Sequence, residues 1–313
     1  MTEGYHTPVM LSEAVEALNV RPDGVYVDVT FGGGGHSRAI LERLGPGGRL
    51  IAFDQDEDAA KRVESGEWKV ESEAGFTFIH ENFRYLKNYL RVYGVRRVDG
   101  VLADLGVSSH QFDTAERGFS TRFEGELDLR MDRRGETTAR SLVNTLDEVE
   151  LSRLLRLYGE LPNARQMAKA IVKARATQEI VTTTDLREAV SHHLPRGMEN
   201  KYLAMLFQAL RIEVNGELES LKEMLQQAVE LLPVGGKVVV ISYHSLGDRL
   251  VKNFFRSGNF EGEVKKDFYG NPLSPVKPVG RLQASEGEVT ANSRARSARL
   301  RVGEKVEVVS EEK

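Results

Sequence analysis

The chain has 313 residues, 40% hydrophobic and 29% charged, which is an ordinary composition for a globular protein of one or two domains. Its formal net charge of −4 argues against a protein that coats nucleic acid by bulk charge, so a nucleic-acid partner would have to meet local basic patches. The absence of cysteine excludes disulfides, thiolate metal sites and a thiol nucleophile. No cluster of metal ligands stands out, so no metal site is expected.

No apolar run approaches the roughly 20 residues of a membrane span, and the N-terminus lacks the pattern of a signal peptide. We therefore expect no membrane partner and a cytoplasmic location. The first predicted element is a helix that opens at His6-Thr7-Pro8, with Thr7 as its cap and Pro8 in its first turn. Its buried stripe is expected to comprise Met10, Leu11, Ala14, Val15 and Leu18.

An apolar strand, Val25–Val29, carries an acid at Asp28 and leads into four glycines, Gly32–Gly35. A helix is predicted behind them, over His36–Leu44. A strand, a glycine turn and a helix start together make a site where backbone N–H groups point at a bound anion. Glycine is expected there because a Cβ would block the ligand and forbid a positive φ.

A second strand, Arg49–Phe53, ends at Asp54. A carboxylate at this place can accept both hydroxyls of an adenosine ribose, although Asp54 could instead cap the next helix, Asp56–Val63. The ligand could be NAD or S-adenosylmethionine. Because Asp28 would repel a pyrophosphate but suits the ammonium group of a methionyl tail, S-adenosylmethionine is favoured.

Strands and helices continue to alternate, which predicts a parallel, doubly wound sheet. A third strand is expected at Phe76–His80, then a helix capped by Asn82, then a fourth strand at Val98–Ala103. Ligands of such sheets bind beyond the carboxyl ends of the strands, which places Asp104 and Gln111 in the predicted crevice. The alternative interpretation of the stretch from Asp104 to Gln111 is that it is only a turn rich in small polar residues, with no role in binding.

From about Ala115 the pattern changes. Residues 116–136 are dense in charge and glycine and predict an ordered or closing loop. Three helices without strands follow, at Leu146–Tyr158, Ala164–Ala176 and Asp185–His193, the third capped by Thr184 or Asp185. We expect a helical insert, residues 111–204, in an α/β domain formed by residues 1–110 and 205–313. Arginines of the insert could bind phosphates, although charged helix faces are more often merely solvated. These arginines are Arg122, Arg130, Arg133, Arg134, Arg165 and Arg175.

The sheet is expected to resume after the helix Lys201–Val214. The remaining predicted elements are a helix at Glu217–Leu232, a strand at Lys237–Tyr243, a turn at His244–Arg249, a helix at Leu250–Arg256, a long loop at Gly258–Pro278 and an edge or hairpin strand at Ser297–Val306.

Several stretches of the chain, in order, resemble one family, the MraW (RsmH) methyltransferases of small-subunit ribosomal RNA. They are Thr30–Ser37, Asp104–Ser109, Ala115–Ser120, Asp128–Asp132, Ala209–Asn215, Ser242–Arg249 and Asn292–Ser297. The resemblance covers nearly the whole chain. It implies an α/β fold, a Rossmann-like class I methyltransferase sheet with an inserted small helical domain that recognises RNA.

The resemblance also implies an activity. The donor would be S-adenosyl-L-methionine, with S-adenosyl-L-homocysteine as product, and the acceptor the exocyclic 4-amino group of a cytidine in the decoding region of small-subunit (16S) ribosomal RNA, within the 30S particle. Cofactor contacts carried over by motif fall on Gly34, Gly35, His36, Asp54, Phe83, Asp104 and Gln111. Phe83 would stack near the adenine, and Gln111 could bond a polar edge of the cofactor.

The cytosine amine is a poor nucleophile because its lone pair is delocalised into the ring. Transfer to it needs a hydrogen-bond acceptor, a close approach of the reacting atoms and exclusion of water. Amino methyltransferases of DNA often use a short Asp/Asn/Ser-Pro-Pro-aromatic turn, and this chain has Asp104-Leu-Gly-Val instead. The hypothesis is that Asp104, or a backbone carbonyl beside it, is the acceptor; Asp104 could equally serve only the cofactor, and His244 is the second candidate.

The target base must be splayed out to enter the crevice, which is easiest in a loop or bulge. The main expected phosphate contacts are Arg294, Arg296 and Arg299, whose alternative role is the solvent face of an edge strand. Three competing functions remain open from the sequence: an NAD-dependent oxidoreductase, a non-catalytic ribosome-assembly factor and a DNA amino methyltransferase. The sequence does not indicate an oligomeric state, a metal dependence, or whether the substrate is free RNA or the assembled small subunit.

Overall fold

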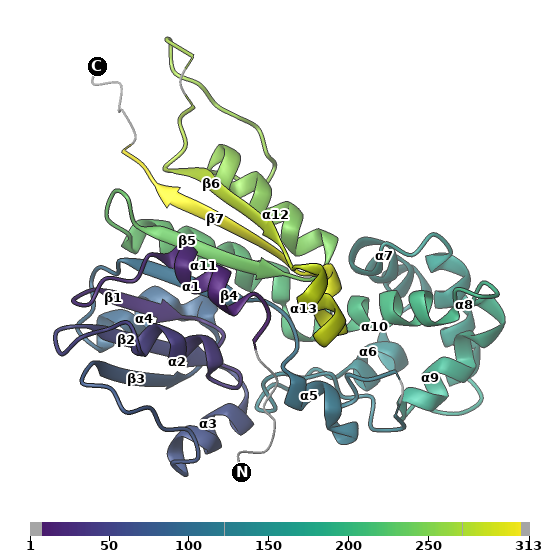
Figure 1. Cartoon of the computed structure of the whole chain (residues 1–313). Helices are drawn as coiled ribbons and strands as arrows, with labels where there is room; N and C mark the ends of the chain where they lie inside the picture. Colours follow the sequence, from purple (N-terminus) through teal and green to yellow (C-terminus); the bar gives the residue numbers. More distant parts are fainter. Residues whose placement is uncertain (1–7, 122, 271, 308–313) are drawn as a thin grey trace. The chain divides into compact units, whose positions relative to one another are not determined.

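The computed structural model describes residues 8–121, 123–270 and 272–307, and the chain folds into two compact units (Figure 1). The first unit comprises residues 1–106 and 218–313, and the second comprises residues 107–217. The expected insert, residues 111–204, falls within the second unit. The predicted helix start at His6 and the cap at Thr7 lie outside the described residues.

The first unit is built on one seven-stranded sheet with the order β3-β2-β1-β4-β5-β7-β6. The strands are β1 (Val25–Asp28), β2 (Arg49–Asp54), β3 (Gly75–His80), β4 (Gly100–Asp104), β5 (Lys237–Ser242), β6 (Val276–Gln283) and β7 (Arg299–Lys305). The first five are parallel, whereas β7 runs antiparallel to both β5 and β6. The predicted doubly wound α/β sheet is therefore confirmed, with its order reversing between β1 and β4.

The last strands depart from the sequence prediction. The predicted strand near the C-terminus is β7, which forms a hairpin with β6 but lies inside the sheet. The edge strand is β6, and its first residues fall in the segment expected to be a loop. Its ladder is irregular between Pro278 and Gly280. Proline cannot donate to a ladder and glycine weakens a strand, so this sequence carries the composition of a loop.

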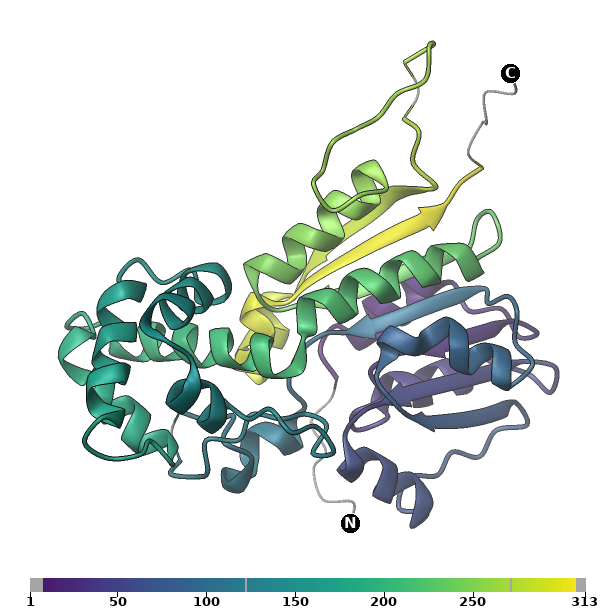
Figure 2. The same cartoon turned by 180° about the vertical axis from the view of Figure 1, so that it is seen from behind.

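Helices cover both faces of the sheet (Figures 1 and 2). One face packs against α4 (Leu86–Val92), α11 (Glu217–Leu231) and α12 (Ser245–Ser257) through strand residues such as Val27 and Val101. The other face packs against α1 (Leu11–Leu18), α2 (Gly35–Leu41) and α3 (Glu57–Glu64) through their neighbours, such as Tyr26 and Leu102. Strand residues buried on both faces give continuous apolar runs, which is typical of a parallel sheet.

Capping residues set two helix starts that differ from the prediction. Helix α1 begins at Leu11 because Met10 adopts the left-handed conformation, with φ 53°, so Pro8 precedes the helix. Helix α12 begins at Ser245, five residues earlier than predicted, because His244 caps it by accepting a hydrogen bond from the Gly247 N–H. Short elements complete this unit: η1 (Phe83–Tyr85), α13 (Glu286–Ala291) and η4 (Ser293–Ser297).

The second unit is helical and has its own hydrophobic core. Its elements are α5 (Ser109–Asp113), η2 (Ala115–Arg117), α6 (Ala139–Thr145), α7 (Glu148–Gly159), α8 (Ala164–Arg175), α9 (Thr183–Val190), η3 (Ser191–His193) and α10 (Glu199–Asn215). Helix α6 was not predicted, and α10 belongs to this core. The predicted cap of α9 is wrong, since Thr182 accepts the hydrogen bond from the Asp185 N–H.

The charged segment at 116–136 is ordered where the structure describes it. The Arg117 side chain is 1% exposed and donates to the carbonyl oxygens of Arg130 and Met131, at 3.1 and 3.2 Å. From α10, the Asn215 amide accepts from the Met131 N–H at 2.7 Å and donates to the Leu129 carbonyl at 2.8 Å. Buried backbone groups satisfied in this way fix the segment as part of the helical unit. Arg122 lies outside the described residues.

Candidate functional site

The glycine loop, Gly32–Gly35, follows β1. It lies at the carboxyl ends of the parallel strands, an edge of the sheet that we call the crest. The Phe31 N–H donates to the Phe53 carbonyl at 2.9 Å, and the Gly34 N–H donates to the Phe31 carbonyl at 2.7 Å. Gly34 has φ 75°, and a Cβ there would lie 2.1 Å from Nε1 of Trp68, whose indole donates to the Gly34 carbonyl at 3.2 Å. A glycine is therefore required at 34 by a protein contact beneath the loop, and not only by the approach of a ligand.

Gly35 is constrained in the same way. A Cβ at this residue would lie 2.2 Å from Cγ of Pro8, in the segment that precedes α1. The loop is thus packed against protein atoms on two sides, Trp68 on one and Pro8 on the other. Its backbone conformation is held before any ligand arrives, which reduces the ordering cost of binding.

Asp54 ties the end of β2 to this loop. Its Oδ2 accepts from the Gly32 N–H at 2.7 Å, and its Oδ1 accepts from the Asp56 N–H at 2.9 Å. Burial raises the pKa of Asp54 to about 6, against the lowering effect of these two hydrogen bonds. The alternative role as helix cap is wrong, because Asp56 caps α3. The ribose contact of Asp54 stays a prediction.

Asp28 is buried at the end of β1, beneath the glycine loop. Its side chain is 0% exposed and accepts from the Ser37 hydroxyl at 2.7 Å and from the Thr30 N–H at 3.1 Å. Burial raises its pKa. Asp28 connects β1 to the first turn of α2 beneath the glycine loop, and its suitability for a ligand ammonium group stays a prediction.

Asp104 lies at the carboxyl end of β4, beside the glycine loop. Its backbone N–H donates to the Thr30 hydroxyl at 2.6 Å, and its Oδ1 accepts from the Tyr243 hydroxyl at 2.7 Å. The Asp104 side chain is 21% exposed. Burial raises the pKa of Asp104 to about 7, against the lowering effect of the Tyr243 hydroxyl. Asp104 is therefore poised to exchange a proton near neutral pH.

His36 faces the same carboxyl group. Its Nδ1 lies 3.8 Å from Oδ2 of Asp104. Burial lowers the pKa of His36 to about 4, so the imidazole is neutral at pH 7 and the contact is not an ion pair. A hydrogen bond with the backbone of Val9 opposes this lowering.

The crest therefore gathers three carboxyl groups, the buried Asp28 and the partly buried Asp54 and Asp104. The negative charge of Asp28 contributes to the raised pKa of both Asp54 and Asp104. Such a cluster favours a cationic ligand and opposes a pyrophosphate. The preference for S-adenosylmethionine over NAD consequently rests on the cluster as a whole and not on Asp28 alone.

Phe83 and His244 flank this crest in the sheet unit. Phe83 opens η1 after Asn82, whose side-chain amide donates to Oε1 of Gln55 at 2.7 Å. Since Gln55 follows Asp54, this bond links the end of β3 to the end of β2. His244 follows β5, and its Nδ1 accepts from the Gly247 N–H at 3.2 Å. The structure thus gives His244 a capping role, and its catalytic role stays a prediction.

Gln111 belongs to the second unit, in α5. Its side-chain oxygen accepts from the Ser108 N–H at 3.0 Å, and its own N–H donates to the Ser108 hydroxyl at 3.1 Å. These two bonds form a capping box, and the side chain is 4% exposed. Its cofactor contact stays a prediction.

The expected phosphate-binding arginines lie near the start of β7. Arg294 and Arg296 are in η4, and the Arg299 side chain is 45% exposed and donates to Oδ2 of Asp248 at 3.1 Å. Sequence reasoning missed that Arg301 also binds Asp248, at 2.6 and 2.9 Å. Burial alone would raise the pKa of Asp248, and the two guanidinium groups lower it below its usual range. Part of this arginine cluster therefore serves the fold.

Several arginines expected to contact phosphate in the second unit are engaged within it. Arg130 donates to both carboxylate oxygens of Asp128, at 2.7 and 2.9 Å. Arg175 donates to the Val143 carbonyl at 2.7 Å.

Over residues 8–121, 123–270 and 272–307, no group of three His, Asp or Glu side chains is placed to hold a metal ion. Over the same residues, no helix has the length and apolarity that crossing a membrane requires.

A doubly wound parallel sheet that carries a glycine loop and carboxyl groups at the carboxyl ends of its strands is the arrangement of the nucleotide-binding α/β proteins. The model of the MraW methylase family matches residues 3–306. The chain belongs to this family of S-adenosylmethionine-dependent methyltransferases. S-adenosylmethionine is accordingly its cofactor, and the residues at the crest fit it, because they combine a preformed glycine loop with carboxyl groups that attract positive charge.

Close relatives align over almost the full chain. Proteins named Ribosomal RNA small subunit methyltransferase H are 53% identical in Flavobacterium johnsoniae, over 97% of this chain and 99% of the relative, and 54% identical in Phocaeicola vulgatus, over 96% and 97%. Among solved structures, a putative rRNA methylase from Clostridium thermocellum matches with a TM-score of 0.44 and 14% identity, over 96% of this chain and 100% of that one.

Proposed function

We propose that this protein transfers a methyl group from S-adenosylmethionine to the exocyclic 4-amino group of a cytidine in the decoding region of small-subunit ribosomal RNA. Relatives at 53–54% identity carry the name of a small-subunit ribosomal RNA methyltransferase, which supports the RNA substrate. The single observation that carries the choice of an amino group is Asp104, a carboxyl group with its pKa raised to about 7 at the crest.

The two oxygens of Asp104 differ in their surroundings. Oδ1 accepts from the Tyr243 hydroxyl at 2.7 Å, which leaves Oδ2 for a substrate. An amine that donates a hydrogen bond to Oδ2 gains electron density at nitrogen, and the methylated amine then loses a proton. A carboxyl group that titrates near pH 7 is suited to both roles. His244 is the second candidate for the acceptor, and a backbone carbonyl beside Asp104 is the third.

The cofactor contacts are proposed for the crest and α5. Gly34, Gly35 and His36 would offer backbone groups to the methionyl part, Asp54 the ribose contact and Phe83 a stacking surface for adenine. Asp104 and Gln111 complete the proposed set. When bound, S-adenosylmethionine supplies an activated methyl group on sulfonium and leaves as S-adenosylhomocysteine. The preformed loop and the buried carboxyl groups orient this donor and exclude water from the reacting atoms.

The RNA contacts are proposed for the helical unit and for Arg294, Arg296 and Arg299. The target cytidine would be splayed from its neighbours, as in a loop or bulge. We propose the 30S particle as the natural substrate and the cytoplasm as the location of the reaction. Exposed guanidinium groups suit phosphate because they donate two parallel hydrogen bonds to it.

The test is transfer of labelled methyl from S-adenosylmethionine to small ribosomal subunits that lack this modification, with duplex DNA as a parallel substrate. We expect label in the small-subunit RNA at one decoding-region cytidine and none in DNA. Label in DNA alone would make the protein a DNA amino methyltransferase, and binding to subunits without transfer would make it an assembly factor. A rise in unfolding temperature with NAD but not with S-adenosylmethionine would contradict the proposal at its first step.

A further inference from the structure

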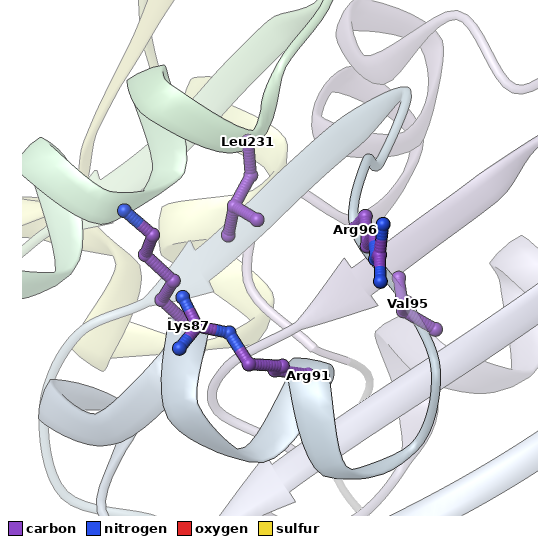
Figure 3. A pocket seen from close by; sticks show the side chains of 5 residues that line it. All are labelled: Lys87, Arg91, Val95, Arg96 and Leu231. Carbon is purple, nitrogen blue, oxygen red and sulfur yellow. The ribbon is translucent and has the colours of Figure 1, made fainter.

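A groove in the first unit lies away from the crest, where the parallel strands begin. It has a volume of about 340 Å³ and is lined by Lys87, Arg91, Val95, Arg96 and Leu231 (Figure 3). Lys87 and Arg91 project from α4, and Leu231 is the last residue of α11. Val95 and Arg96 belong to the segment that leads from α4 into β4.

The floor of the groove is apolar and its rim is basic. Val95 and Leu231 are buried, at 7% and 5% exposure, and pack into the core of this face of the sheet. Lys87 forms an ion pair with Glu230 of α11. Within the part of the chain that the structure describes, Arg91 and Arg96 are exposed and form no ion pair or hydrogen bond through their guanidinium groups. The groove therefore presents two uncompensated guanidinium groups.

Tyr93 and Arg49 add an exposed aromatic ring and a further guanidinium group to this basic region. Tyr93 lies in the turn after α4, between Arg91 and Arg96, and is 42% exposed. Its carbonyl accepts from both terminal nitrogens of Arg49 at 3.4 Å, which brings a third guanidinium group beside the turn. Guanidinium groups bind phosphate oxygens in pairs, and an exposed aromatic ring is a stacking surface for an unpaired base.

We propose that this groove binds the phosphate backbone of the substrate RNA, as a second contact remote from the methyl-transfer site. The inference rests on the proposed RNA substrate. The protein carries a net charge of −4, so an RNA strand would be held at local basic sites of this kind. Phosphates would lie on Arg91 and Arg96, with the apolar floor beneath a sugar or base.

The separation between the groove and the crest suits one continuous strand. Strand β4 runs from Gly100, four residues after Arg96, to Asp104 at the crest, and its four steps of about 3.3 Å give a straight length of about 13 Å as the minimum separation. A stacked strand rises about 3.4 Å per nucleotide, so a strand that follows the surface needs at least about five nucleotides to join the two places. The groove would thus hold nucleotides a short distance from the target cytidine.

Crosslinking tests this placement directly, because the chain has no cysteine of its own. An Arg96→Cys variant labelled with a thiol-reactive photo-crosslinker is mixed with small ribosomal subunits and irradiated. The matched control is Arg43→Cys, an exposed arginine that follows α2 on the other face of the sheet. We expect the first label to crosslink ribosomal RNA near the methylated cytidine, and the control not to. Equal RNA crosslinking from both positions would overturn the proposal.

Salt dependence provides the second readout. For Arg91→Gln with Arg96→Gln, the slope of log affinity for small-subunit ribosomal RNA against log salt should become shallower by about 1.4, at roughly 0.7 per lost phosphate contact on a single strand. The matched control, Arg43→Gln with Arg281→Gln, removes the same charge from two other exposed sites and should keep the wild-type slope. An unchanged slope in the first variant would overturn the proposal.

Two parallel measurements separate the causes of failure. Both double variants should keep the wild-type affinity for S-adenosylmethionine and the wild-type unfolding temperature, which shows that the fold is intact. Methyl transfer by the wild type to the same subunits tests the proposed function independently of the crosslink. Binding of inorganic phosphate or anionic phospholipid vesicles, abolished by the Arg91 and Arg96 changes but without an RNA crosslink, would assign the groove to another anion and overturn the RNA contact.

Discussion

The hydroxyl of Tyr243 donates a 2.7 Å hydrogen bond to Oδ1 of Asp104, across the carboxyl ends of the neighbouring parallel strands β4 and β5. Burial raises the pKa of Asp104 to about 7, and the bond from Tyr243 opposes this rise. Burial in turn raises the pKa of Tyr243 well above its usual value, so the phenol stays a donor. The pair thus orients the carboxyl group proposed to accept the substrate amine.

Removing the phenolic hydroxyl should shift the pH dependence of methyl transfer. In Tyr243→Phe, the ionised form of Asp104 loses a donor worth about 1.5–3 kcal/mol, which corresponds to roughly 1–2 pKa units. The acidic limb of kcat/KM against pH should move to higher pH by that amount. The control is Tyr269→Phe, at a tyrosine that is 86% exposed. If the limb stays in place, Asp104 is not the group that titrates.

Removing the charge of Asp104 separates its proposed roles. Asp104→Asn keeps the size of the side chain and an oxygen for the Tyr243 hydroxyl. We expect weakened but measurable S-adenosylmethionine binding and, at saturating S-adenosylmethionine, a fall in methyl transfer of about 10²–10⁴-fold, the usual contribution of a general base. The comparison variant is Asp23→Asn, at an exposed aspartate. Full turnover with intact cofactor binding would exclude Asp104 as the acceptor, whereas lost binding would assign it to the cofactor.

The glycine loop should tolerate no side chain at Gly34. An added Cβ would lie 2.1 Å from Nε1 of Trp68, at a φ of 75°. Gly94 offers a matched control, because it has φ 73° and nothing lies within 4 Å of its added Cβ. Gly94→Ala should cost about 1–2 kcal/mol of unfolding free energy from backbone strain alone. Gly34→Ala should cost about 1–3 kcal/mol more in urea unfolding, and equal costs would exclude the indole contact as the constraint.

The buried carboxyl groups should make the ligand-free protein less stable as the pH rises. The pKa of Asp54 is about 6 and that of Asp104 about 7, both above the roughly 3.9 of an unfolded chain, so the folded state binds protons more tightly. Their contribution to the unfolding free energy is fully present below pH about 4 and is lost as pH rises to about 7.

Thermal unfolding between pH 5 and 8 measures this effect. Asp54→Asn and Asp104→Asn should each show a smaller loss of unfolding temperature over this range than the wild type, and the exposed Asp23→Asn should not differ from it. S-adenosylmethionine should stabilise the wild type more at pH 8 than at pH 5, because the ionised carboxylates attract the cation. Parallel pH curves for wild type and both variants would mean that neither group is perturbed in solution.

Local patterns in the sequence were sufficient for most of the sheet. Alternating apolar strands and amphipathic helices predicted β1 to β5 and their parallel arrangement, since each strand carries its own apolar run. Strand β6 was missed because Pro278 and Gly280 interrupt its pattern. The start of α12 was missed because histidine is an unusual helix cap, and the ring of His244 accepts from the Gly247 N–H.

The site was predicted less completely, because its chemistry depends on residues far apart in the chain. Asp104 and Tyr243 meet only because β4 and β5 are neighbours, an adjacency that a single sequence does not specify. Asp28 was assigned to the ligand from its place beside the glycines. The structure buries it against Ser37 and Thr30, a tertiary constraint that no spacing rule contains.

The most direct test of the proposed activity is the chemical position of the transferred methyl group. Small ribosomal subunits are methylated by the wild-type protein with isotopically labelled S-adenosylmethionine, the RNA is digested to nucleosides, and the labelled product is identified by mass spectrometry against synthetic standards. We predict labelled N4-methylcytidine from one decoding-region site, strongly reduced with Asp104→Asn. Label on a ring carbon or a ribose hydroxyl, or no label in the RNA, would contradict the proposed transfer to an amino group.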